Sequence, residues 1–205
     1  MTDVTSEHRF KGTTTVGVVF RDGVVLCADK RATMSTFIAA KAVDKIHPVS
    51  DRMAMTIAGS VGDAQILVRM ISAELELYKY SKGGELSVQG AATLLSNVLQ
   101  GNKYFPYFVQ LILAGFDSAP RLFDLDPFGG LIEEKYVSTG SGSITAYGYL
   151  DSHFKEGFPE EDAVRLAQHA VQAAIKRDSA TGEGVDTIVI TRAGIKRLAT
   201  KPVVA

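Results

Sequence analysis

The order of the elements predicted from hydrophobic periodicity constrains the fold more than any other feature of this chain. Strands come first, then two helices in succession, then strands, two more helices and a closing pair of strands. Single helices alternating with strands are typical of a doubly wound parallel sheet, whereas adjacent helix pairs favour antiparallel sheets with the helices packed outside. We therefore predict an α+β fold, a four-layer αββα sandwich of two antiparallel sheets flanked by helix pairs.

The first two predicted strands indicate a sheet that is covered on both faces. They span Thr13–Phe20 and Val24–Asp29, and the Asp22-Gly23 pair between them is a strong hairpin signal. Both strands carry apolar residues at odd and even positions alike, as expected when neither face meets water. Further strands are expected at Lys41–Ile46, Met53–Ala58, Phe108–Phe116, Arg121–Asp124, Leu131–Ser138, Thr187–Thr191 and Ile195–Leu198.

Four helices and two turns are expected between these strands. The helices are recognised by apolar residues at helical spacing and, for the last one, by acidic residues directly after Pro159. The turns are rich in proline, glycine, serine and aspartate. The expected helices are Asp63–Tyr80, Ser87–Gln100, Ser141–Lys155 and Pro159–Arg177, and the expected turns are His47–Asp51 and Asp126–Gly130.

The composition is that of one soluble globular domain. The chain has 205 residues, of which 46% are hydrophobic and 22% charged, and its net charge of −1 gives no electrostatic footprint for a nucleic acid. No run approaches the ~18 apolar residues of a membrane span, and the first residues lack the apolar core of a signal peptide. The single cysteine, Cys27, excludes an internal disulfide and is expected to be a buried apolar residue. We therefore expect a cytoplasmic protein without a membrane partner.

The polar first residues end in a glycine, and three threonines open the first predicted strand. If the Gly12–Thr13 bond is cut, Thr13 carries a hydroxyl that can attack a carbonyl and a free α-amine that can take the proton. An α-amine titrates near pH ~8, so a useful fraction is unprotonated at neutral pH. The alternative is an ordinary strand start, because β-branched residues suit strands.

Several separated motifs resemble one known family. Together and in this order, they make the chain similar to proteasome β subunits of the archaeal type, which are N-terminal-nucleophile hydrolases. The resemblance spans Thr13 to Leu198. The motifs are Gly12-Thr13-Thr14-Thr15-Val16-Gly17, Ala28-Asp29-Lys30-Arg31-Ala32-Thr33, Thr56-Ile57-Ala58-Gly59, Gly62-Asp63-Ala64-Gln65, Tyr104-Phe105-Pro106-Tyr107, Ser138-Thr139-Gly140-Ser141-Gly142-Ser143 and Lys176-Arg177-Asp178-Ser179.

This resemblance implies a precursor and a catalytic set. Residues 1–12 would be a propeptide removed by autocleavage at Gly12–Thr13, and residues 13–205 the hydrolase domain. The implied catalytic residues are Thr13 as nucleophile, Lys45 and its acidic partner Asp29, Gly59 as oxyanion donor, and the polar residues Ser141 and Asp178. Thr181 is a supporting residue where many family members have serine. Taken singly, each also fits an ordinary structural role, such as a surface lysine, a strand-end carboxylate, a turn glycine or a helix cap.

The resemblance also implies a substrate-binding region. Arg31 and Thr33 match positions near the site, and Thr33 is expected to pair with the substrate backbone as an added strand would. The side chain before the scissile bond would enter a pocket whose largely apolar lining suggests a preference for hydrophobic residues. The pocket positions are Val43, His47, Ile57, Val61 and Gln65.

The function implied is that of a catalytic β subunit of a 20S-type proteasome, a threonine endopeptidase acting on unfolded polypeptides inside a barrel of seven-membered rings. Its implied partners are other β subunits, proteasome α subunits and an ATPase regulator, with no metal and no cofactor. One alternative is a non-catalytic ring subunit, against which the complete catalytic set argues. Another is an N-terminal-nucleophile amidohydrolase that acts on small amides.

Overall fold

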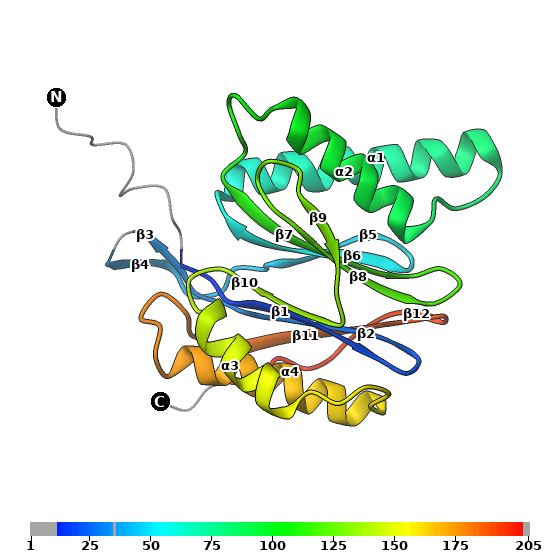
Figure 1. Ribbon diagram of the computed structural model, residues 1–205. Coiled ribbons are helices and arrows are strands. Elements are labelled where there is room, and N and C mark those ends of the chain that lie inside the picture. The colour runs from blue at the N-terminus through cyan, green and yellow to red at the C-terminus, as the bar shows by residue number, and fades with distance from the viewer. Residues whose placement is uncertain (1–11, 35, 203–205) are drawn as a thin grey trace, which may run out of the picture.

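The computed structural model describes residues 12–34 and 36–202. Two five-stranded antiparallel sheets face each other between two layers of helices, which confirms the predicted sandwich (Figure 1). The first sheet has the strand order β10 (Tyr136–Thr139), β1 (Thr15–Phe20), β2 (Gly23–Asp29), β11 (Val185–Thr191) and β12 (Gly194–Arg197). The second has the order β5 (Ile46–Ser50), β6 (Met53–Gly59), β7 (Val109–Phe116), β8 (Pro120–Leu125) and β9 (Leu131–Glu133).

Each sheet carries a pair of helices on its outer face. Helices α1 (Val61–Lys82) and α2 (Val88–Gly101) cover the second sheet, and α3 (Ser143–His153) and α4 (Glu160–Ile175) cover the first (Figure 1). Helix α1 begins two residues before the predicted start because the Ser60 side chain accepts a hydrogen bond from the backbone N–H of Asp63 and caps it. No helix in the described ranges is long and apolar enough to cross a membrane.

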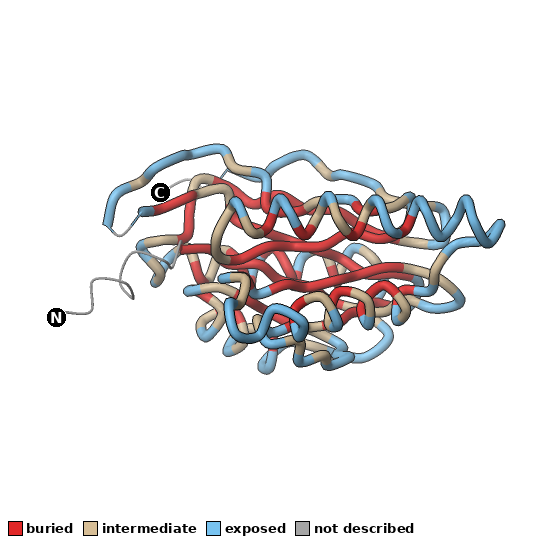
Figure 2. Tube along the Cα trace, turned by 90° about the horizontal axis from the view of Figure 1, so that it is seen from above, coloured by how far each residue is buried: buried red, intermediate tan, exposed pale blue. Residues whose placement is uncertain are grey.

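The apolar side chains form three layers of core. One lies between each helix pair and its sheet, and the third lies between the two sheets. The buried strands run through the middle of the molecule in Figure 2, while each helix is buried only on its inner side. All seven residues of β2 are buried, as predicted from its apolar residues on both faces. The sheets approach closely at Gly17, where a Cβ would lie 2.6 Å from Leu122 Cδ1.

Three predictions about strands and turns were wrong or incomplete, and one pair of strands was not predicted. Residues 41–45, the core of the predicted strand Lys41–Ile46, are irregular, and the predicted turn His47–Asp51 is mostly strand β5. Pro48 is tolerated there because β5 is an edge strand with a register shift after Pro48. The predicted strand Leu131–Ser138 is two strands, β9 and β10, that belong to different sheets. The two-stranded ribbon of β3 (Ala32–Met34) and β4 (Phe37–Ala40) was not predicted.

Candidate active site

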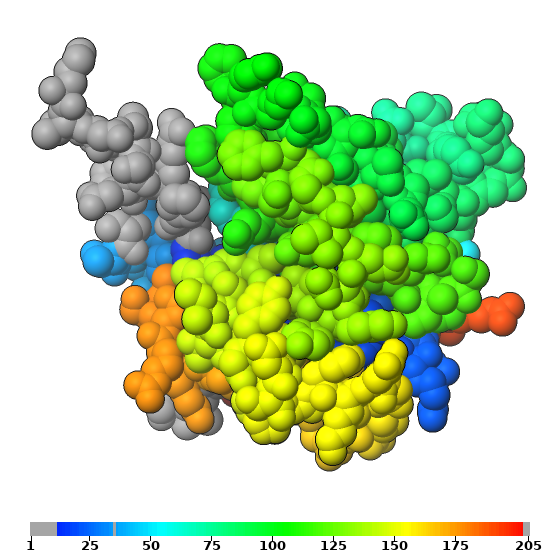
Figure 3. All heavy atoms as spheres, in the orientation of Figure 1, coloured from blue at the N-terminus to red at the C-terminus, as the bar shows by residue number. Residues whose placement is uncertain are grey.

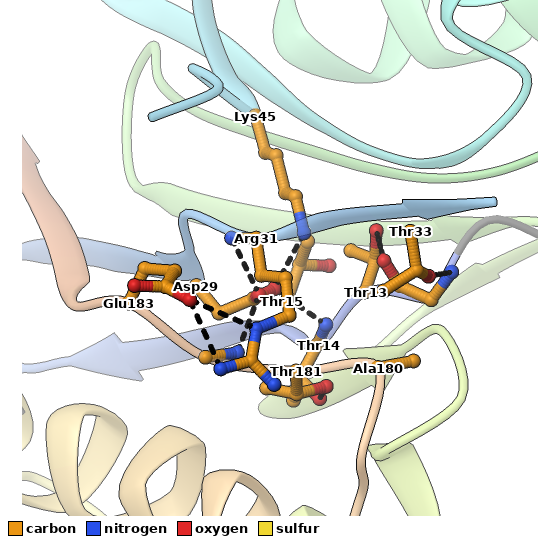
Figure 4. A network of polar contacts seen from close by, with 12 residues as sticks. Thr13, Thr14, Thr15, Asp29, Arg31, Thr33, Lys45, Ala180, Thr181 and Glu183 are labelled. Carbon is orange, nitrogen blue, oxygen red and sulfur yellow. Dashed lines mark hydrogen bonds and ion pairs between the residues drawn. The ribbon is translucent and has the colours of Figure 1, made fainter. Parts of the chain in front are cut away.

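The predicted catalytic residues lie at one end of the sandwich, where chain segments from both sheets approach each other, and Figure 4 shows Thr13, Asp29 and Lys45 among them. Thr13 lies two residues before the start of β1 and Asp29 ends β2, so both come from the first sheet. Lys45 directly precedes β5 and Gly59 ends β6, so both come from the second. Ser141 and Asp178 belong to the loops after β10 and α4. Figure 3 shows the loop after α4 (orange) beside the β3–β4 ribbon (blue) at this end of the molecule.

A buried ion pair forms the centre of the site. Lys45 Nζ lies 2.7 Å from Asp29 Oδ1, and both side chains are almost completely buried. Burial lowers the pKa of the Lys45 ammonium, although the charge and hydrogen bond of Asp29 oppose this shift. A lysine with a lowered pKa is closer to exchanging a proton near neutral pH than an exposed one.

The Asp29 carboxylate is held by the backbone as well as by Lys45. Its Oδ1 accepts the N–H of Thr14 (2.9 Å), and its Oδ2 accepts the N–H groups of Arg31 and Gly182 (3.0 Å each). These bonds fix the Asp29 carboxylate in place, and the Lys45 side chain is oriented against it.

Thr13 lies between its own preceding carbonyl and Ser141. Its Oγ1 donates a hydrogen bond to the Gly12 carbonyl oxygen (2.7 Å), and its backbone N–H donates to Ser141 Oγ (3.2 Å). Gly12 is itself held, because its N–H donates to Thr33 Oγ1 (2.9 Å). A Cβ on Gly12 would lie 1.8 Å from the Cβ of Ala180, so only glycine fits this path. In this uncleaved chain the Thr13 nitrogen is an amide, which cannot act as a base.

A second carboxylate supports Thr13 from the other side. Asp178 Oδ2 accepts hydrogen bonds from Ser141 Oγ (2.5 Å) and Thr181 Oγ1 (2.6 Å). The γ-methyl of Thr181 is accommodated, since the side chain is buried and its hydroxyl is fully engaged. Gly140 has a φ of 93°, and a Cβ there would lie 2.1 Å from the Thr13 carbonyl oxygen. The loop after β10 therefore needs glycine at this position to approach Thr13.

The predicted oxyanion residue also requires glycine. Gly59 has a φ of 121°, a conformation that side chains disfavour, and a Cβ there would lie 2.1 Å from the Phe108 carbonyl oxygen. Gly59 lines two hollows that flank Gly12. It therefore lies where a chain that passes through the site would come close to its backbone.

The first hollow, of about 370 Å³, is lined by all five predicted pocket residues. Thr13 and Lys45 line it too, so the candidate nucleophile and the buried ammonium face one space. His47 is one of these lining residues. Its burial and the positive charge of Arg197 lower the pKa of its imidazole, while the negative charge of Asp44 opposes the shift. Sequence analysis did not identify four further lining residues, Ala32, Ala42, Asp44 and Ala64.

The second hollow, of about 580 Å³, lies on the other side of Gly12. Thr33, Ser141, Tyr107, Phe108 and Phe128 are among its lining residues. Its lining includes residues of β6 and β7 in the second sheet and of the loop after β10 in the first.

Arg31 is placed differently from the other predicted binding residues and lines neither hollow. Its guanidinium makes an ion pair with Glu183 (3.0 Å) and donates to the Ser179 carbonyl oxygen (2.8 Å). These contacts fasten the loop after α4 to the end of β2.

A family model described as "Proteasome subunit" matches residues 10–190. The chain belongs to the proteasome subunit family. It is of the archaeal β type, because its curated relatives carry the name "Proteasome subunit beta". The protein of Methanohalophilus mahii is 51% identical over 197 residues, which cover 95% of this chain and 94% of the relative. That of Archaeoglobus fulgidus is 52% identical over 187 residues, covering 90% and 88%. That of Methanosarcina mazei is 49% identical over 195 residues, covering 94% and 93%.

Two features of this proteasome subunit were not found from its sequence. Thr14 bonds directly to Asp29, and a Cβ on Gly142 would lie 2.1 Å from Thr14 Oγ1. The only signal for Gly142 was its place directly after Ser141 in a family motif. Among the described residues no group of three or more His, Cys, Asp or Glu side chains is arranged to hold a metal ion. Cys27 is buried, which raises the pKa of its thiol to about 12.

Proposed function

We propose that this proteasome subunit is catalytic, a threonine endopeptidase that hydrolyses peptide bonds of unfolded polypeptides with Thr13 as its nucleophile. One observation carries the proposal. The Thr13 hydroxyl bonds to the carbonyl oxygen of the Gly12–Thr13 peptide, and Thr13 also faces the hollow lined by Lys45. The hydroxyl is thus next to a peptide carbonyl, the group that it must attack both in its own chain and in a substrate.

The first reaction would remove residues 1–12 as a propeptide. Of these residues only Gly12 lies within the described part of the chain. Thr13 Oγ would form a bond to the Gly12 carbonyl carbon, the C–N bond would break, and the nitrogen would take a proton to leave as a free amine. Water would then hydrolyse the ester, releasing the leader as a carboxylate and restoring the hydroxyl.

Substrate hydrolysis would use the amine that this cleavage creates. Thr13 Oγ would attack the substrate carbonyl while the α-amine takes its proton, and the Gly59 N–H would stabilise the oxyanion. The amine would then pass the proton to the leaving nitrogen and later deprotonate the water that hydrolyses the ester. The positive charge of Lys45 would favour both the unprotonated amine and the developing negative charge.

The two hollows suggest how a polypeptide would lie. The side chain before the scissile bond would enter the first hollow, whose lining of Ala32, Val43, Ile57, Val61 and Ala64 favours an apolar group. The residues after the bond would lie along the second hollow.

We propose that the subunit works in the cytoplasm in a seven-membered ring of a 20S-type particle, with α subunits and an ATPase regulator, so that only unfolded chains reach the threonine.

The decisive experiment compares the wild-type chain with Thr13→Ala in assembled particles. We expect hydrolysis of a fluorogenic peptide with an apolar residue before the scissile bond to fall by at least about 10³-fold. Intact mass should show a wild-type chain that starts at Thr13 and a variant that keeps its leader. Undiminished hydrolysis by the variant would leave only the structural role of a ring subunit. Activity of free monomers toward small amides would instead indicate an amidohydrolase.

A further inference from the structure

Thr14, the residue after the proposed nucleophile, contacts Asp29 directly (Figure 4) and Asp178 through Thr181. Its backbone N–H donates to Asp29 Oδ1, the oxygen that also accepts from Lys45 Nζ. Its Oγ1 lies 2.8 Å from Thr181 Oγ1, which in turn bonds to Asp178 Oδ2. Thr14 is completely buried, so water does not compete for these contacts. Thr14 therefore connects the Lys45–Asp29 pair, through its backbone N–H, with Asp178, through its side-chain hydroxyl and Thr181.

The direction of these hydrogen bonds follows from the number of protons available. An ionised carboxylate only accepts, so the single hydroxyl proton of Thr181 is used in its bond to Asp178. In the bond between the two threonines, Thr14 must therefore be the donor and Thr181 the acceptor. A hydroxyl that accepts one hydrogen bond donates a stronger one, because bonds in a chain polarise each other. The Thr14 hydroxyl thus strengthens the bond that Thr181 makes to the carboxylate.

The loop after β10 has space for the Thr14 hydroxyl because it carries a glycine beside it. A Cβ on Gly142 would lie 2.1 Å from Thr14 Oγ1 and 3.3 Å from Asp178 Oδ2, so the loop after β10 can close over both groups only with glycine there. The backbone fixes Thr14 as well, since its carbonyl oxygen accepts the N–H of Asp29 (3.1 Å). Thr14 lines neither hollow. It acts on the reaction through other residues and does not touch the substrate.

We propose that Thr14 is a positioning residue for peptide hydrolysis by this chain, an inference that rests on the proposed function. Through Thr181, its hydroxyl would orient the Asp178 carboxylate and disperse its charge. Asp178 in turn holds Ser141, whose Oγ is bonded to the Thr13 nitrogen. A threonine at position 14 would therefore keep the nucleophile's amine aligned and set how tightly that amine holds its proton.

Thr14→Val tests this proposal because valine keeps the shape and removes only the hydroxyl. In assembled wild-type and variant particles, we expect kcat for a fluorogenic peptide to fall about three- to tenfold, the effect of losing roughly one net hydrogen bond. KM should stay within about twofold, since Thr14 touches no substrate. The acidic limb of the kcat profile should move to higher pH by a few tenths of a unit, because a less dispersed Asp178 charge holds the amine proton more tightly.

Two further comparisons separate positioning from simple stability. Thr14→Ser and Thr14→Ala both lose the γ-methyl, and only serine should restore the wild-type pH profile. This pair also decides the question if Thr14→Val does not assemble. Thr187→Val is the matched control: Thr187 is a buried threonine of the same sheet whose hydroxyl bonds to Cys27 and Gln168, away from the site. It should lower stability without moving the pH profile.

The outcomes are distinguishable from a failure of the proposed function. If wild-type hydrolysis depends on Thr13, and Thr14→Val and Thr14→Ala keep the wild-type kcat and pH profile, the positioning role is wrong while the enzyme assignment stands. Equal shifts in Thr14→Ser and Thr14→Ala would also overturn the role of the hydroxyl. If Thr13→Ala particles remain fully active, the enzyme assignment and the role of Thr14 fail together.

Discussion

Asp29 holds three separate backbone segments with one carboxylate. The N–H groups of Thr14, Arg31 and Gly182 converge on its two oxygens, and the Lys45 ammonium completes the set. The side chain is buried, so water cannot replace a lost partner. Asp29 therefore shapes the fold around the nucleophile in addition to orienting the lysine.

Asp29→Asn should destabilise the chain strongly. An amide has the same shape, but its NH₂ must face either two backbone N–H donors or one such donor and the Lys45 ammonium. We expect the free energy of unfolding to fall by about 3–5 kcal/mol, as for a buried ion pair that loses one partner. Urea denaturation of the full chain at pH 7 measures this. Asp51→Asn, at an exposed carboxylate, should cost less than about 0.5 kcal/mol. Similar losses in the two variants would contradict the role given to Asp29.

The sequence identified the charged residues of the site but not the residue that connects them. Asp29 and Lys45 could be selected because they fall within family motifs. Thr14 stands in a run of three threonines, where residue type alone does not distinguish it from a strand residue. Its partner Thr181 is 167 positions away, and no periodicity within the sequence relates the two. Such a contact becomes visible only when β1 and the loop after α4 are placed together.

At the scale of elements, the β1–β2 hairpin was predictable and the segment that carries Lys45 was not. The β1–β2 hairpin follows from its turn and its apolar residues. Residues 41–45 also look like a strand, yet they are held by single backbone bonds, from Val43 N–H to the Lys30 carbonyl and from Ile57 N–H to the Lys45 carbonyl. Hydrophobic pattern cannot show whether a segment finds a partner along its whole length. The irregular path places Lys45 beside Asp29.

A second ion pair joins strands β2 and β11 at this end of the molecule. It predicts that the free energy of unfolding depends on pH. The hydrogen bond to Asp186 raises the pKa of Lys30 above 10.5. Burial would raise the pKa of Asp186, but hydrogen bonds from Lys30 and Thr200 outweigh it, so the value lies below 3.8. Because the pKa of Asp186 is lowered on folding, its contribution to the free energy of unfolding is complete above pH 3.8 and is lost as pH falls through the folded pKa. Because the pKa of Lys30 is raised on folding, its contribution is complete below pH 10.5 and is lost as pH rises through the folded pKa.

Asp186→Asn should therefore lower stability at neutral pH and much less in acid. We expect a loss of about 1–2 kcal/mol in the free energy of unfolding at pH 7. The difference from wild type should shrink at acid pH, below the folded pKa of Asp186, where both chains carry an uncharged group at this position. Urea denaturation at the two pH values measures the two differences. A loss that is equally large in acid would show that the ion pair is not its cause.

At the scale of the whole molecule, both outer helical layers expose large apolar side chains. Tyr80 on α1 is 93% exposed, and Ile144 on α3, in the opposite layer, is 84% exposed. The two layers lie on opposite sides of the sandwich (Figure 1). In the ring stack proposed above, these two side chains would be covered by other subunits.

Tyr80→Asp and Ile144→Asp should accordingly block particle formation without unfolding the subunit. A charge on an exposed helix position changes stability by no more than about 0.5 kcal/mol, whereas an unpaired charge buried in an interface costs several times more. Each variant would be produced with an α subunit and examined by native mass spectrometry, with thermal unfolding of the free chain as the check on its fold. Tyr80→Phe and Ile144→Val keep the apolar surface and should assemble. Full-sized particles from both aspartate variants would mean that these faces stay exposed, and that the ring stack proposed for this chain uses other surfaces.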